Sequence, residues 1–204
     1  MDEPAFALVG ELSVGKNISV HAKGCTEGLA FHALSMVTVR HEGPGDPASI
    51  YSVNVRAFGQ PAEAELVGAL RERGQITLSL VAVQEGRIVG HILFSPVTIE
   101  SDNVTYPAVG LGPMAVLPEL QRQGIGSLLI KAGLAECRKV GHERVIVLGH
   151  AEYYPRFGFI PASQYEMRCE YDVPDEIFMF LELRKGAFQG KAGTVKYQPE
   201  LNEV

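Results

Sequence analysis

Residues 112–129 read GPMAVLPELQRQGIGSLL and combine an apolar strand, a tight corner and the start of an amphipathic helix. The corner, QRQGIG at 121–126, fits the pattern Q/R-x-x-G-x-G/A. Gly124 and Gly126 lack a Cβ, so backbone N–H groups at this corner can approach an anion closely. A helix N-terminus adds unpaired N–H donors and the positive end of the helix dipole. The stretch therefore predicts a binding site for a pyrophosphate group.

The sequence around the corner supports this interpretation. Residues 109–117 are apolar and interrupted by glycines, as in a buried strand with a bulge, and Pro118 marks the end of that strand. Gly141 ends the following helix, and VIVL at 145–148 is a short apolar strand. The helix itself is indicated by apolar residues at helical spacing, namely Ile125, Leu128, Leu129, Ala132 and Ala135. The corner thus lies in a strand–helix–strand unit, where a phosphate loop is expected.

A second motif follows this unit. Residues 153–159 read YYPRFGF, so Tyr154 stands four residues before Gly158. Phe157 and Phe159 are expected to pack in the core, whereas Tyr154 is a candidate for chemistry.

The two motifs, in this order, resemble the GNAT superfamily, the Gcn5-related acyl-CoA N-acyltransferases. The resemblance covers roughly residues 35–184. Residues 62–162, with GHILFSP at 90–96, look closest to the bacterial YhbS-like predicted N-acetyltransferases. The resemblance to the GNAT superfamily implies an α/β, GNAT-like three-layer α/β/α fold. Its central sheet would be mixed, mainly antiparallel, and splayed between strands 4 and 5. The resemblance also implies acetyl-CoA as co-substrate, no metal, and an amine acceptor that is a small molecule or a protein amine.

The resemblance assigns site residues as well. Coenzyme A pyrophosphate would lie on the corner, and the pantetheine arm would bond the strand before it. Tyr154 matches the general acid of the family. The corner residues are Gln121, Arg122, Gln123, Gly124, Ile125, Gly126 and Ser127, and the strand residues are Met114, Ala115 and Val116.

The general base is left open by the sequence. His150, at the end of the strand beside the splay, and Glu65, on the second helix, are candidates for the base or for acceptor contacts. Glu63 on the same helix and His91 on the central strands are further candidates. For each of them the alternative is a purely structural role, as a solvated carboxylate or a core histidine.

The predicted function is transfer of an acetyl group from acetyl-CoA to a primary amine by direct attack in a ternary complex. Such a reaction needs no covalent acyl-enzyme, so no nucleophilic triad is required. The alternative is a non-catalytic acyl-CoA-binding or regulatory GNAT module. The presence of Tyr154 favours the enzyme.

Length, charge and composition argue against several other classes of function. The chain has 204 residues and a net charge of −6, which fits one globular domain and disfavours nucleic acid as a partner. No apolar stretch approaches the ~20 residues of a membrane span. The scattered Cys25, Cys137 and Cys169 suggest a reducing, cytoplasmic location and no metal cluster. A homodimer is compatible with the sequence.

The domain organisation is expected to have three parts: an extension of unknown role at 1–34, the GNAT domain at 35–184, and a loosely packed tail at 185–204. The extension contains Gly10–Asn17, a near match to a nucleotide-binding loop that lacks its hydroxyl residue. Residues 100–107 read as a loop. The last two strands, near 165–171 and 177–184, are expected to form a final hairpin.

Overall fold

The computed structural model describes residues 37–101 and 104–202. The predicted extension at 1–34 and its near match at Gly10–Asn17 lie outside the described residues. The α-helices are α1 (Pro47–Phe58), α2 (Ala62–Glu72) and α3 (Ile125–Lys139). The strands are β1 (Thr38–His41), β2 (Leu78–Gln84), β3 (Arg87–Ser101), β4 (Val104–Val116), β5 (Arg144–Leu148), β6 (Ile160–Pro161), β7 (Met167–Cys169), β8 (Phe178–Glu182) and β9 (Gly193–Lys196).

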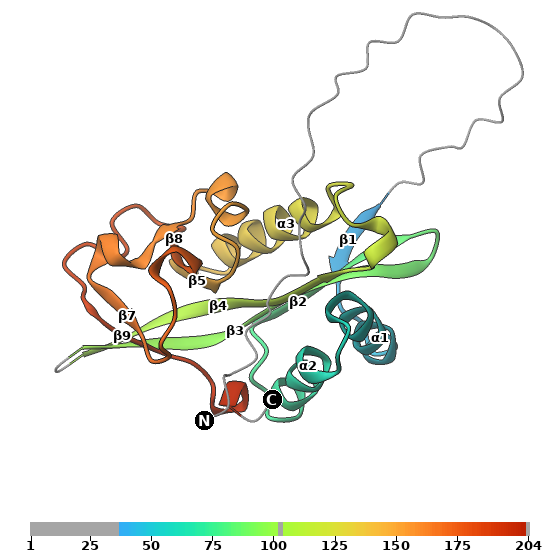
Figure 1. The fold of residues 1–204 in the computed structure, drawn as a ribbon, viewed down its shortest axis with the longest axis horizontal. Coiled ribbons are helices and arrows are strands. Elements are labelled where there is room, and N and C mark those ends of the chain that lie inside the picture. The colour runs from blue at the N-terminus through green and yellow to red at the C-terminus, as the bar shows by residue number, and fades with distance from the viewer. Residues whose placement is uncertain (1–36, 102–103, 203–204) are drawn as a thin grey trace, which may run out of the picture.

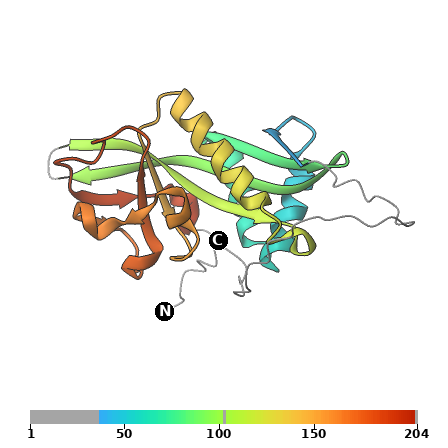
Figure 2. The same ribbon diagram turned by 90° about the horizontal axis from the view of Figure 1, so that it is seen from above.

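Three layers make up the fold. Figure 1 shows α1 and α2 on one face of the sheet and α3 on the other, and Figure 2 shows α3 crossing the strands obliquely. The main path of the sheet runs β1-β2-β3-β4-β5-β8-β6, and β9 pairs with both β3 and β7. Only the β4–β5 and β7–β9 pairs of the described sheet are parallel. The predicted three-layer α/β/α fold with a mixed, mainly antiparallel sheet is confirmed.

The sheet separates within residues 109–117, where the glycine-interrupted apolar run predicted a bulge. Strand β4 pairs with β5 only over Val109–Leu111. The β3–β4 register then shifts, because Gly112 and Pro113 together stand opposite Leu93. Beyond this bulge β4 stays paired with β3 but no longer with β5. The splay between strands 4 and 5 therefore begins at Gly112, whose φ of 151° is accessible to glycine.

Helix α3 lies very close to the sheet, and this closeness sets the position of its N-terminus. A Cβ added at Gly133 would stand 2.6 Å from Cζ of Phe94, and one at Gly90 would stand 3.1 Å from Cδ1 of Leu129. Two glycines, one on α3 and one on β3, thus let helix and sheet approach one another. The helix forms as its apolar spacing predicted, but the predicted face is only partly right. Ile125 and Leu129 are buried against the sheet together with Ile130, Leu134 and Cys137, whereas Leu128 and Ala135 are exposed.

The prediction of a loop at 100–107 is wrong. Strands β3 and β4 continue as a long hairpin, pairing out to Ser101 and Val104. Strand β9 pairs with the other edge of β3 at Thr98–Glu100. A segment that reads as polar and irregular is thereby held as strand by partners that are distant in sequence.

The prediction of a loosely packed tail is also wrong. Phe188 and Val195 are buried, and the side chain of Gln198 donates a hydrogen bond of 2.8 Å to the carbonyl of Pro96. The final hairpin does not form either, because β7 pairs with β9 whereas β8 pairs with β5 and β6. The described part of the tail therefore completes the sheet.

Candidate functional site

The corner after β4 contains two residues in the left-handed backbone conformation. Arg122 and Gly124 both have positive φ, at 62° and 90°. The Nε2 of Gln121 donates 3.1 Å to the carbonyl of Val116, which ties the corner to the end of β4. A left-handed conformation at a non-glycine residue such as Arg122 is uncommon and often marks a functional site. The side chain of Arg122 is exposed to solvent.

The N-terminus of α3 opens directly onto this corner. Gly124 is its N-cap and makes no side-chain capping bond, and no acidic residue stands in the first turn. The first helical hydrogen bond runs from the N–H of Leu128 to the carbonyl of Gly124. The N–H groups of residues 125–127 precede it and point out of the helix end, together with the positive end of its dipole. This arrangement suits an anion.

Beside the corner, one edge of β4 is not paired with another strand. Met114, Ala115 and Val116 are buried and pair with β3, but they lie beyond the last residue of β4 that pairs with β5. Main-chain groups on that edge are therefore free of a strand partner. An extended ligand with amide groups can bond such an edge as an added strand would.

Tyr154 begins the short 3-10 helix Tyr154–Phe157 that follows β5. Its ring packs against Gly149 at the end of β5 and meets the rings of Tyr153 and Phe159 edge to face, at 5.4 and 5.5 Å. The side chain is only 1% exposed. Burial raises the pKa of the phenol well above its usual value, so Tyr154 carries its proton at neutral pH.

Tyr153 also lies at the candidate site, although the sequence analysis did not single it out. Its Oη lies 2.8 Å from the point where a Cβ at Gly126 would stand, and Cε of Met114 lies 3.4 Å from the same point. The hydroxyl thus reaches the first turn of α3. The family motif matches the second tyrosine of YYPRFGF, and the presence of two adjacent tyrosines is the only sequence signal for the first.

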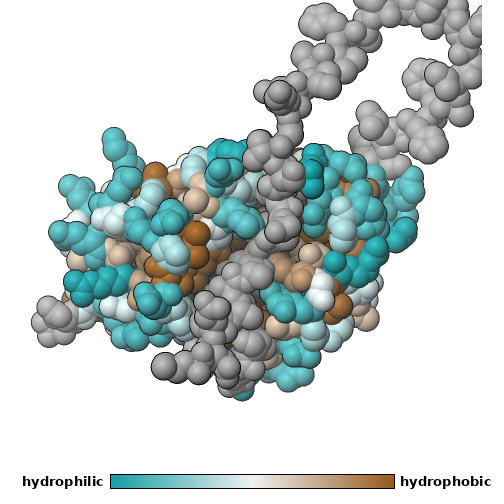
Figure 3. Space-filling view, in the orientation of Figure 1, coloured by the Kyte–Doolittle hydropathy of each residue, from teal (hydrophilic) through white to brown (hydrophobic). Residues whose placement is uncertain are grey.

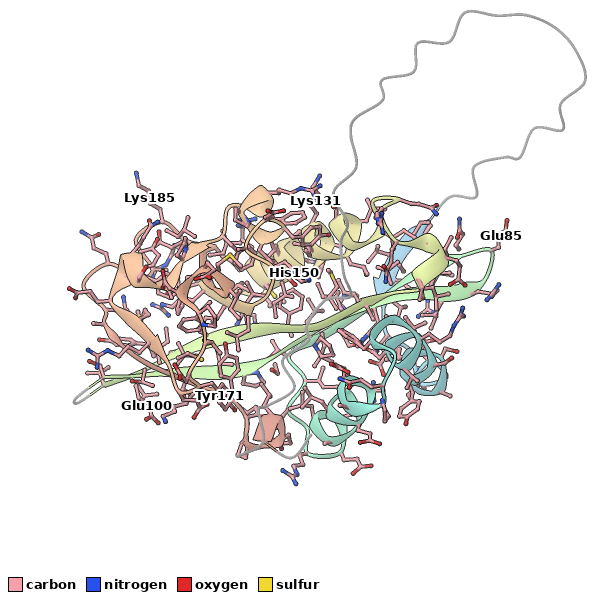
Figure 4. The ribbon with its side chains drawn as sticks, viewed as in Figure 1. Glu85, Glu100, Lys131, His150, Tyr171 and Lys185 are labelled. Atoms are coloured by element: carbon pink, nitrogen blue, oxygen red, sulfur yellow. The ribbon has the colours of Figure 1, made fainter. Side chains whose placement is uncertain are left out.

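His150 lies between β5 and these tyrosines. Its carbonyl accepts a hydrogen bond of 3.0 Å from the N–H of Tyr153, and the side chain is half-buried. Figure 4 shows His150 near α3, above the sheet in that view. The structure therefore brings His150, Tyr153, Tyr154 and the start of α3 together.

The two acidic candidates lie on the other face of the sheet. Glu65 is exposed on α2, whereas Glu63 is buried and accepts a hydrogen bond of 3.2 Å from Nε2 of Gln60. Helix α2 and helix α3 cover opposite faces (Figure 1). Glu65 is thus separated from Tyr154 by the sheet.

The remaining candidate, His91, is fully buried and bonded at both ring nitrogens. Nδ2 of Asn54 donates both to the carbonyl of Ile50 and to Nδ1 of His91. A carbonyl only accepts, so the orientation of the amide is fixed, and Nδ1 of His91 must be the unprotonated nitrogen. Nε2 then donates 3.0 Å to Oγ of Ser79, which in turn donates 2.5 Å to Glu42.

This chain of bonds requires a neutral imidazole. Burial, aided by the positive charge of Arg71, lowers the pKa of His91 to about 3. We conclude that His91 is a structural histidine and not the general base.

A groove of about 670 Å³ lies elsewhere, at the outer edge of the sheet. It is lined by the end of β1, the start of β2 and the C-terminal part of α3, including Glu136 and Val140. The 15 residues of α3 span about 22 Å at 1.5 Å each, so this groove is far from the corner.

The face of the molecule seen in Figure 3 is mostly hydrophilic and carries separate apolar patches. These apolar patches lie on both sides of the part of the view that is drawn in grey. Within residues 37–101 and 104–202, no helix has the length and apolar character needed to cross a membrane. The same residues contain no group of three or more histidine, cysteine or acidic side chains placed to hold a metal ion.

Comparison with known proteins places this geometry in a family. The model of the acetyltransferase (GNAT) family matches residues 48–159. The uncharacterized N-acetyltransferase YhbS of Escherichia coli K12 is 35% identical over 165 residues, which are 80% of this chain and 98% of that protein. The uncharacterized N-acetyltransferase YjhQ of the same strain is 42% identical over 134 residues, or 64% of this chain and 74% of that protein.

Solved structures agree. Escherichia coli YhbS in complex with CoA matches with a TM-score of 0.79 at 32% identity, covering 85% of this chain and 96% of that one. A GNAT family acetyltransferase of Brucella melitensis in complex with acetyl-CoA matches with a TM-score of 0.68 at 36% identity, covering 81% and 98%. With the splayed sheet, the uncapped helix and these relatives together, the chain belongs to the GNAT family of acetyltransferases.

Proposed function

We propose that this chain transfers an acetyl group from acetyl-CoA to a primary amine. The observation that carries the proposal is the uncapped N-terminus of α3 beside the gap between β4 and β5. The two solved relatives named above hold CoA and acetyl-CoA. By analogy the pyrophosphate lies on residues 121–127, and the pantetheine arm bonds the free edge of Met114–Val116.

The chemistry follows from what surrounds the thioester in that pose. The amine nitrogen attacks the carbonyl carbon, a C–N bond forms and the C–S bond breaks. A main-chain N–H at the β4 bulge donates to the carbonyl oxygen as negative charge develops on it. The departing thiolate takes the phenol proton of Tyr154, which solvent restores. The amine gives up a proton to a base, for which His150 is the better placed candidate and Glu65 the other.

The non-catalytic alternative has one observation in its favour, because Tyr154 is almost fully buried. Calorimetric titration with acetyl-CoA and with free CoA tests the shared part of both hypotheses. Micromolar binding of both ligands supports the donor site, and absence of binding would refute it. Thiol release from acetyl-CoA in the presence of small amines and lysine peptides then separates the two, since only the enzyme releases CoA faster with amine than without.

A further inference from the structure

Tyr153 bridges the gap that the splay opens. It belongs to the segment that follows β5, yet its hydroxyl reaches the other side of the gap. There the hydroxyl lies beside Gly126 on α3, 2.8 Å from the point where a Cβ of residue 126 would stand. Cε of Met114 on β4 lies 3.4 Å from the same point. Because the β4–β5 ladder ends at Leu111 and Val147, this side chain joins elements that the sheet itself no longer holds together.

The ring of Tyr153 is held in place from several sides. It meets the ring of Tyr154 at 5.4 Å and that of Phe157 at 5.3 Å, both edge to face. The guanidinium of Arg156 lies 5.2 Å from the ring centroid, a cation–π contact. The main-chain N–H of Tyr153 donates a hydrogen bond to the carbonyl of His150. The hydroxyl is therefore fixed at the start of α3 before any ligand binds.

That position gives the hydroxyl a specific chemistry. The N–H groups at the start of α3 are hydrogen-bond donors without a capping side chain. A phenol O–H beside them adds one more donor from the opposite side of the gap. Phosphate oxygens accept several hydrogen bonds at once, and bonds to a charged acceptor are stronger than neutral ones. Tyr154, in contrast, is buried against Gly149.

We propose that Tyr153 binds the donor substrate: its hydroxyl donates a hydrogen bond to a phosphate oxygen of coenzyme A held at the N-terminus of α3. This inference rests on the proposed function, since it names a further contact of the same site. It divides the two adjacent tyrosines between two tasks. Tyr153 completes the phosphate site, and Tyr154 serves the departing thiolate.

The test compares ligands with and without phosphate. Calorimetry measures CoA binding to the wild type, Tyr153→Phe and Tyr51→Phe, an exposed tyrosine on α1 that serves as control. Pantetheine, which lacks phosphate, is measured by competition against CoA. Tyr153→Phe should weaken CoA binding about tenfold, consistent with loss of one charged hydrogen bond, and leave pantetheine binding unchanged. Tyr51→Phe should match the wild type for both ligands.

A second variant checks the contact itself. The Cβ of Gly126→Ala collides with Oη of Tyr153 but not with a phenylalanine that lacks this atom. Gly126→Ala should therefore weaken CoA binding more in the wild-type background than in the Tyr153→Phe background. Thermal melts establish that each variant is folded.

The outcomes separate the two proposals. If the wild type binds CoA and Tyr153→Phe binds it equally well, or loses CoA and pantetheine by the same factor, the phosphate contact is wrong and the donor site stands. If the wild type fails to bind CoA, the proposed function itself is wrong.

Discussion

The ring of Tyr154 packs directly on the backbone of Gly149. A Cβ at position 149 would stand 2.9 Å from Cδ2 and 3.1 Å from Cζ of that ring. Glycine at the end of β5 is thus what allows the tyrosine to lie against the strand, at the edge of the gap between β4 and β5. The side chain of Tyr154 is buried there, and burial raises the pKa of its phenol above the usual value.

We expect Tyr154→Phe to lower turnover about a hundredfold while changing the Kd for acetyl-CoA by less than about twofold, because a general acid contributes to the rate and not to donor binding. Thiol release at saturating acetyl-CoA gives turnover, and calorimetry gives the Kd. Phenylalanine keeps the packing on Gly149, so the fold is preserved. An equal loss in turnover and affinity would mean that Tyr154 is only a structural residue.

Gly126→Glu should abolish acetyl-CoA binding. Its side chain would meet Oη of Tyr153 and Cε of Met114, and its carboxylate would bring negative charge to the site proposed for pyrophosphate. Gly45→Glu is the matched control, because a Cβ at Gly45 meets nothing within 4 Å. Calorimetric titration of both variants decides the matter. Unaltered binding by Gly126→Glu would place the donor elsewhere.

His91 should make the protein less stable in acid. Its pKa is about 3 in the fold against an ordinary value of 6.5, so the unfolded chain takes up a proton between these pH values and the folded chain does not. The free energy of unfolding contributed by His91 is complete above about pH 6.5. It falls by at most about 1.4 kcal/mol per pH unit as the pH is lowered towards 3.

Urea unfolding at pH 7 and pH 5 measures this contribution in the wild type and in His91→Gln, which cannot titrate. The wild type should lose about 2 kcal/mol more than the variant between the two pH values. Equal losses in the two proteins would show that His91 is not held neutral by the fold.

Phe188→Ala should destabilise the protein by about 3–5 kcal/mol, the usual cost of removing a buried aromatic side chain. Phe188 is 1% exposed, and its ring lies 4.9 Å from those of Tyr165 and Phe180. Val140→Ala, at a side chain that is 67% exposed, is the control and should cost much less. Urea unfolding compares the two. A loss below about 1 kcal/mol for Phe188→Ala would mean that the carboxyl-terminal segment is not part of the core.

Local sequence determined those turns and helices whose conformation follows from the residues within or next to them. The hairpin turn at Glu85–Gly86 has φ of 50° and 75°, and its second residue is a glycine, which adopts positive φ readily. Helix α3 and the corner before it follow from apolar spacing and from two glycines, and the bulge in β4 follows from a glycine-interrupted apolar run. In each case the pattern and its structural cause lie within a few residues of one another.

Only the tertiary structure decided the rest. Strand β9 has four residues, too few for a periodic pattern, and it is a strand because β3 and β7 pair with it. His91 reads like a candidate base until Asn54 and Ser79 bond both of its nitrogens. The sequence analysis assigned no role to Tyr153, and only the fold places its hydroxyl at the start of α3. Partners far apart in sequence set these features, and a pattern confined to neighbouring residues does not contain them.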